Sequence, residues 1–187
     1  MKNALSILGK FLPLTTMMLA LVLCFTSYAE AEQLTSGEYQ VKAVFLLNFA
    51  KFTQWPAGAF ANEQSSIVLG ICGDDDFGDA LNAIDGKTAK GRKLVIRKLG
   101  KGGNLQGCHI LFISSSEKWR LQQILSELAD QPVLTVGDMD HFAEQGGIIS
   151  LRNEGKKIRL TINLASAQRA DLKISSQLLN IATIVGN

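Results

Sequence analysis

The spacing of apolar residues predicts helices alternating with short strands. In residues 37–56, GEYQVKAVFLLNFAKFTQWP, apolar side chains recur every three or four residues, which predicts an amphipathic helix that ends near Trp55. Its apolar face consists of Val41, Val44, Phe45, Phe49 and Phe52. Apolar runs typical of strands follow at residues 67–72, 92–99, 108–114 and 132–138. Helices are predicted between them, at 77–84 and at 115–130, the second capped by Ser115 or Ser116.

The last third of the chain continues this pattern and adds a hairpin. A short helix near Met139–Glu144 precedes two strands within residues 147–163, which flank the turn residues Asn153-Glu154-Gly155. A closing helix is predicted from Ile174, Leu178, Leu179, Ile181 and Ala182. The order of elements predicts an α/β fold: a mostly parallel, doubly wound sheet with an antiparallel edge hairpin and helices on both faces.

The first residues predict export to the periplasm. Lys2 and Lys10 precede a nearly uncharged run, Phe11 to Phe25, and the small-residue pattern that follows fits cleavage near Ala29 or Ala31. An apolar run of this length is shorter than the roughly 20 residues that a membrane-spanning helix needs. Residues 1–31 are therefore interpreted as a signal peptide that is removed, and residues 32–187 as a single domain.

The charge of the chain argues against two classes of partner. The whole sequence has 19 basic and 17 acidic residues, and removal of Lys2 and Lys10 leaves the exported part close to neutral. A neutral domain gives no electrostatic reason to expect nucleic acid or an anionic membrane as its partner.

The segment IVLGICGDDDFGDAL, Ile67 to Leu81, passes from a predicted strand through three aspartates into a predicted helix. An acidic pair in this place binds Mg²⁺ in receiver domains, but those domains also need an aspartate after a central strand, where this chain has serines at 114–116. A simpler role for Asp75 or Asp76 is to cap the helix that begins at Phe77. We therefore expect a capped corner here, with no metal and no cofactor.

The remaining polar residues favour a binding module over an enzyme. His109 falls in a buried-strand pattern, and neither it nor His141 has a nucleophile or ligand set beside it. Trp55 could anchor a partner, although packing in the core is the simpler role.

Three further polar residues, Arg159, Asn163 and Arg169, flank the hairpin and the last turn. They could form a small anionic-ligand site. They could equally be solvated charges and a capping asparagine.

Two cysteines, Cys72 and Cys108, remain after export. An oxidising compartment favours a disulfide between them. Against this, Cys72 ends one predicted strand and Cys108 begins another, so the two residues lie at opposite ends if these strands are parallel neighbours. The sequence leaves both a bridge and two free thiols open.

Several stretches together resemble the YfiR family of exported proteins. They are VKAVFLLNFAKFTQWP, GICGDDDFGDAL, GCHILFISSSE and the long segment from VLTVGDMDHF to SSQLLNIA, in the same order and with similar spacing. The resemblance implies an α/β periplasmic domain, commonly a homodimer, that regulates and does not catalyse. In the best understood branch the protein binds the periplasmic domain of an inner-membrane diguanylate cyclase and keeps it inactive. An OmpA-like outer-membrane lipoprotein sequesters this repressor, which raises cyclic di-GMP and promotes biofilm formation.

This chain departs from the family pattern in its cysteines. The family more often has a cysteine nearer the position of Gly70, and a second pair later in the chain is replaced here by Gly146-Gly147 and Arg152-Asn153. Redox control is therefore in question for this member. The partner is open between a diguanylate cyclase and a sensor kinase. The alternative function is that of a periplasmic small-molecule receptor, which would bind an aromatic or nucleotide-like ligand at the carboxyl ends of the strands.

Overall fold

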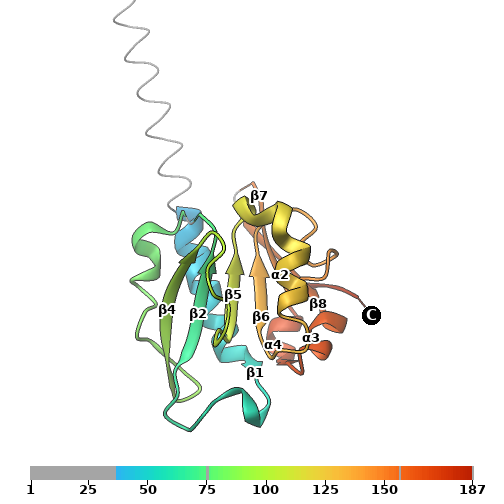
Figure 1. Cartoon of the computed structure of the whole chain (residues 1–187). Helices are drawn as coiled ribbons and strands as arrows, with labels where there is room; N and C mark the ends of the chain where they lie inside the picture. Colours follow the sequence, from blue (N-terminus) through green and yellow to red (C-terminus); the bar gives the residue numbers. More distant parts are fainter. Residues whose placement is uncertain (1–36, 75, 156, 187) are drawn as a thin grey trace, which may run out of the picture. The chain divides into compact units, whose positions relative to one another are not determined.

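A mostly parallel sheet forms the centre of the protein (Figure 1). The computed structural model describes residues 37–74, 76–155 and 157–186, so the predicted signal peptide lies outside the described part. The eight strands follow the order β10-β8-β7-β6-β5-β2-β4-β3, in which β3–β4 and β7–β8 are antiparallel and the other pairs are parallel. Their bounds are β2 Ile67–Cys72, β3 Thr88–Ala89, β4 Arg92–Gly100, β5 Ile110–Ile113, β6 Leu134–Gly137, β7 Ile149–Glu154, β8 Lys157–Asn163 and β10 Thr183–Val185.

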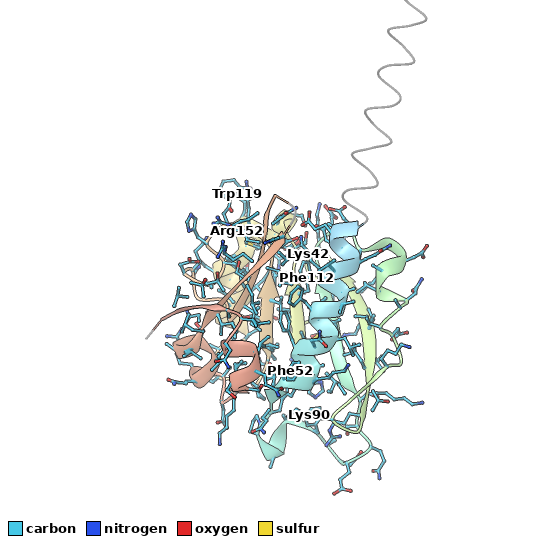
Figure 2. All side chains as sticks on the ribbon, turned by 180° about the vertical axis from the view of Figure 1, so that it is seen from behind. Lys42, Phe52, Lys90, Phe112, Trp119 and Arg152 are labelled. Atoms are coloured by element: carbon cyan, nitrogen blue, oxygen red, sulfur yellow. The ribbon has the colours of Figure 1, made fainter. Side chains whose placement is uncertain are left out.

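Helices cover both faces of this sheet, as predicted. The helix over residues 37–52 packs on the face seen in Figure 2, together with α3 (Leu164–Arg169) and α4 (Ser176–Leu179). The opposite face carries α2 (Leu121–Glu127), preceded by the 3-10 turn η3 (Ser115–Arg120). A separate two-stranded sheet of β1 (Thr53–Gln54) and β9 (Lys173–Ile174) links the end of the first helix to the C-terminal region. The α/β fold expected from the sequence is confirmed.

The alternation of side chains along β2 supplies both hydrophobic cores. Ile67, Leu69 and Ile71 are buried in the larger core, which contains the first helix, whereas Cys72 belongs to the smaller core under α2. Because successive residues of a strand point to opposite faces, a fully buried strand must be apolar at every position. This requirement explains why β2, β5 and β6 were recognisable as continuous apolar runs.

The first helix buries a stripe that only partly matches the predicted one. Phe49 is buried, and Phe45 and Phe52 pack against the larger core, as predicted. Val41 and Val44 were expected on the apolar face, but they are 46% and 53% exposed. The buried stripe runs through Ala43, Leu46, Phe49 and Ala50. Lys42 lies beside this stripe and is buried as well, at 2% exposure, which a pattern of apolar residues cannot anticipate.

Two predicted helices are wrong, and each has a local cause. The region 77–84 contains only the 3-10 turn η2 (Gly78–Leu81), in which Gly78 has a positive φ of 49°. The region 139–144 is a series of turns, because His141 has a φ of 57° and a left-handed residue interrupts a right-handed helix. The cap before η3 is Ser114, whose side chain accepts from the N–H of Ser116, so the predicted cap was placed one or two residues too late.

The C-terminal region contains more elements than the single helix that was predicted. The hairpin of β7 and β8 is confirmed, although Glu154 still pairs with Lys157 and the turn is shorter than expected. The closing helix is reduced to α4, and α3, β9 and β10 were not anticipated. Within the described ranges no helix is both long and apolar enough to cross a bilayer.

Candidate functional site

A cavity of about 330 Å³ lies at the amino ends of β2 and β4. Its walls include Trp55, Phe60, Lys90 and Arg92. The rings of Trp55 and Phe60 meet edge to face, with their centroids 6.1 Å apart, and the Arg92 guanidinium lies 4.0 Å from the centroid of Phe60. We call this group the aromatic cavity. Aromatic walls beside two cationic side chains suit an aromatic anion of small size.

His109 is the structural support of the aromatic cavity. Its ring stacks on Phe60 at a centroid distance of 4.4 Å, and its backbone carbonyl accepts from the indole N–H of Trp55 at 3.3 Å. Nδ1 accepts from the backbone N–H of Val68 at 3.1 Å, so the ring proton lies on Nε2, 3.1 Å from the carbonyl oxygen of Ala59. Burial lowers the pKa of His109, and the charge of Arg92 acts in the same direction. His109 is therefore neutral and satisfied, as the buried-strand pattern suggested.

A buried polar network occupies the other end of the sheet, where Figure 2 labels Lys42. Lys42 Nζ lies 2.6 Å from Asp138, which follows β6, and 2.6 Å from Glu38 one turn earlier in the helix. The Tyr39 hydroxyl also donates to Asp138, at 3.1 Å, and Asn153 of β7 donates to Glu38. Burial and the Asp138 carboxylate raise the pKa of Tyr39 far above its ordinary range. We call these five residues the Lys42 network, and they fix the first helix to β6 and β7.

The two tryptophans differ in their exposure to solvent. Trp55 is only partly exposed, packs against the larger core and is hydrogen bonded, as the core interpretation expected. Trp119 of η3 is 87% exposed, with the Lys118 ammonium 4.9 Å from its ring centroid. From the sequence, the segment Ser116–Trp119 was interpreted only as the start of a helix. The spacing of apolar residues in that predicted helix does not indicate that the Trp119 indole points into solvent.

The structure gives Arg159, Asn163 and Arg169 separate partners. Arg159 Nε donates to Glu154 at 2.7 Å on the exposed face of the hairpin. Asn163 is buried at 7% exposure and caps α3, because its side chain accepts from the N–H of Ser166 at 2.9 Å. Arg169 donates to the Ser166 hydroxyl at 2.9 Å. Asn163 and Arg169 thus meet at Ser166, whereas Arg159 binds Glu154.

The acidic corner after β2 is held by the neighbouring loop. The backbone N–H of Asp74 donates to the Ser116 hydroxyl at 2.9 Å, and its carboxylate pairs with Lys101 at 2.7 Å. The predicted aspartate cap is not formed by Asp76, because η2 begins at Gly78 and the residue in the N-cap position is Phe77, which makes no side-chain capping bond. Asp75 lies outside the described residues. Among described residues, no cluster of three or more His, Cys, Asp or Glu side chains is arranged to hold a metal.

The disulfide considered above is not formed, because Cys72 and Cys108 are both free and buried. The parallel register aligns Cys72 with Ile113, whereas Cys108 precedes β5 and its Sγ lies beside Gly70, two residues before Cys72 on β2. The two cysteines therefore occupy different rows of the sheet and do not face each other. Burial raises the pKa of Cys72 to about 11.

Gly70 explains where a bridge would have formed. A Cβ atom at Gly70 would lie 2.5 Å from Cys108 Sγ. Position 70 is also the place near which the family pattern has its cysteine. In this chain a glycine leaves Cys108 without a sulfur neighbour there, and Arg97 donates to its Sγ at 3.0 Å instead. Burial raises the pKa of Cys108, opposed by Arg97.

The family model that matches this chain covers almost the whole described domain. Residues 39–183 fit the model described as YfiR/HmsC-like. The chain belongs to the YfiR/HmsC-like family. This confirms the resemblance seen in the sequence, and the aromatic cavity and both cysteines lie within the matched residues. Membership of the YfiR/HmsC-like family supports a periplasmic regulator in cyclic di-GMP signalling.

One solved structure adds a distant comparison to this YfiR/HmsC-like assignment. The chain is similar to a conserved domain protein from Vibrio cholerae O1 biovar El Tor, with 15% identity and a TM-score of 0.49. The alignment covers 63% of this chain and 54% of the Vibrio chain. The chain therefore spans about half the length of that protein.

The Lys42 network predicts an asymmetric response to two matched substitutions. Lys42→Met leaves Asp138 buried without its cation, so we expect the free energy of unfolding to fall by about 3–5 kcal/mol. Lys51→Met removes an exposed lysine from the same helix and should change the free energy of unfolding by less than about 0.5 kcal/mol. Urea unfolding followed by circular dichroism measures both. Equal losses for the two variants would contradict the structural role of the network.

The neutral His109 predicts a pH dependence of stability. Its pKa in the folded state is lowered, so below the unfolded value of about 6.5 the unfolded chain binds more protons than the folded one. This contribution to stability is therefore present above about pH 6.5 and decreases as the pH falls below it. Urea unfolding at pH 7.5 and 5.5 should show a smaller loss in His109→Gln than in the unsubstituted protein. The same loss in both proteins would contradict the assignment.

Proposed function

We propose that this protein is a periplasmic regulator that binds an inner-membrane diguanylate cyclase, holds it inactive and so lowers cyclic di-GMP. The observation that carries the proposal is the family match over residues 39–183, which spans nearly all of the described domain. The regulatory character of the family supports the non-catalytic role that is proposed here. A sensor kinase is the other type of partner that the sequence left open.

Restraint of this kind is a linkage between binding and conformation. A regulator that binds the inactive cyclase more tightly than the active one shifts the population towards the inactive state, by an amount set by the two affinities. A competitor that sequesters the regulator reverses the shift. In this proposal an OmpA-like outer-membrane lipoprotein is the competitor, and the regulator itself is a homodimer.

Trp119 is the side chain best suited to contact the cyclase. It is a large aromatic residue exposed over 87% of its surface, beside the cation of Lys118. Tryptophan offers a large apolar area and is enriched among the residues that dominate binding energy in protein interfaces. Trp55, the earlier candidate, contributes to the aromatic cavity and is less accessible.

The proposal is tested by deleting the gene in its own host. Deletion should raise cyclic di-GMP, and the rise should disappear when the partner cyclase is deleted as well. Complementation with Trp119→Ala should restore repression poorly, whereas Val95→Ala, which shortens another exposed apolar residue, should restore it fully. Cyclic di-GMP is measured by mass spectrometry of cell extracts. An unchanged level in the deletion strain would refute the proposed function.

A small-molecule receptor is the second candidate, and the aromatic cavity favours it. The cavity of about 330 Å³ falls within the size range of ligand pockets and has Arg92 and Lys90 for an anionic group. It lies at the amino ends of the strands, and not at the carboxyl ends where the sequence placed the cleft. Thermal unfolding with a panel of aromatic carboxylates tests this function. A rise in the midpoint that is lost in Phe60→Ala would support it, and the absence of any rise would count against it.

A further inference from the structure

An edge of the main sheet is left unpaired beside the hairpin of β7 and β8. The only neighbour of β8 on its outer side, among the described residues, is β10, and their register covers only Thr161–Asn163. The first part of β8, Lys157–Leu160, pairs with β7 on its inner side and with no described strand on its outer side. We call this four-residue segment the open edge.

The hydrogen-bonding groups of the open edge face outward at two residues. Asn163 donates its N–H to Ile148 on the β7 side. In an antiparallel pair this inward direction recurs at every second residue, so Arg159 and Lys157 also face β7. The N–H and C=O groups of Ile158 and Leu160 therefore point away from β7. The parallel register of Thr183 with Thr161 directs the N–H of Thr183 to the C=O of Leu160, so the template that remains in line with β10 consists of two donors and one acceptor.

A cavity lies directly along the open edge. It has a volume of about 420 Å³ and is lined by both sides of the gap, with Ile158 and Leu160 on β8 and Ile181 and Ala182 before β10. The charged residues Glu154, Lys157 and Arg159 also line it. Ile181 is 65% exposed. An apolar side chain carried by an added strand would contact these residues, because it would lie on the same face of the sheet as Ile158 and Leu160.

The charged side chains of the β7–β8 hairpin, which alternate with Ile158 and Leu160 along β8, determine which kind of partner fits. The described residues of the hairpin include three basic side chains, Arg152, Lys157 and Arg159, against one acidic side chain, Glu154. Glu154 already binds Arg159 at 2.7 Å and Arg152 at 3.2 Å, and Asp140 lies 3.9 Å from Arg152, so Lys157 carries most of the uncompensated charge. Lys157 is exposed and has no ion-pair partner among the described residues. An incoming strand with carboxylates on this face would complement the remaining positive charge.

A second copy of this chain fits the open edge poorly. In the antiparallel register that places Ile158 opposite Ile158 of the second copy, Lys157 falls opposite Arg159 of that copy. Like charges directly opposite each other destabilise a strand pair. The same side chains that discourage self-pairing therefore favour a partner of opposite charge.

We propose that the open edge of β8 binds an extended segment of another protein in which acidic and apolar residues alternate. The segment adds a strand next to β8, in line with β10, with its apolar side chains in the cavity and its carboxylates towards Lys157 and Arg159. The inference deepens the proposed function in one respect, because it assigns a surface by which a protein partner can be held.

The test uses the exported protein, residues 32–187, and a synthetic probe, the acetylated and amidated peptide Glu-Val-Glu-Ile-Glu. Nuclear magnetic resonance should show saturable shifts at Ile158 and Leu160 and at least about threefold slower amide exchange there on binding. The peptide with lysine in place of glutamate should not bind. Binding should weaken as salt is raised, because exposed charges are screened.

Three variants separate backbone pairing from charge. Ile158→Pro removes one outward N–H and should abolish binding, whereas Ile158→Val keeps this donor and should bind like the unsubstituted protein. Lys157→Glu leaves the backbone intact and should weaken binding about fivefold or more by charge reversal. If Ile158→Pro does not fold, Lys157→Glu still tests whether the peptide binds at the open edge.

Several results would overturn the inference. They are the absence of saturable shifts at the two amides, equal binding of the lysine peptide, and a dimer in sedimentation that Ile158→Pro dissociates. The result of this peptide-binding test does not depend on the result of the gene deletion. If deletion raises cyclic di-GMP but the open edge binds no peptide, the protein is a regulator that holds its partner elsewhere.

Discussion

The parallel register between β2 and β5 determines where the two cysteines and His109 lie. It aligns Leu69 with Ile110 and Cys72 with Ile113, and the chain that leads into β5 carries Cys108 to Gly70, two residues before Cys72. The two thiols are kept apart although both belong to the smaller core. Just before β5, His109 binds Val68 through both its ring and its backbone, and Cys108 Sγ lies beside Gly70.

Two polar groups at opposite ends of this sheet hold the surrounding elements. At the amino ends, His109 joins Trp55 and Phe60 to the sheet and shapes the aromatic cavity. At the carboxyl ends, the Lys42 network joins the first helix to β6 and β7. Neither group is arranged for catalysis, since His109 is neutral and enclosed and Lys42 is bound by two carboxylates. Both groups fix neighbouring elements to the sheet, and the surfaces that we propose for a partner are the exposed Trp119 and the open edge of β8.

The sequence predicted the fold because apolar runs depend on burial alone. β2 was placed with its observed bounds and β4 within one residue, and the hairpin was recognised from its two strands and glycine. Elements governed by single backbone angles were missed. The left-handed conformation of His141 ends a predicted helix, and nothing in the apolar pattern indicates that angle.

The candidate site was less predictable, because its contacts join residues far apart in the chain. Lys42 and Asp138 are 96 positions apart, and neither residue type suggests burial by itself. Asn163 was correctly considered as a capping residue, since asparagine before a helix has a local role. The exposure of Trp119 depends on how η3 leaves the sheet, which sequence spacing does not encode. Whether Cys72 and Cys108 can form a disulfide depends on how β2 and β5 are aligned, and this alignment is known only once the fold is known.

The most direct test of the account is a binding measurement with purified components. The exported protein is titrated into the isolated periplasmic domain of the partner cyclase, and the heat of binding is followed by calorimetry. The account predicts a saturable complex that Trp119→Ala weakens. No detectable binding between two folded domains would contradict regulation by direct contact.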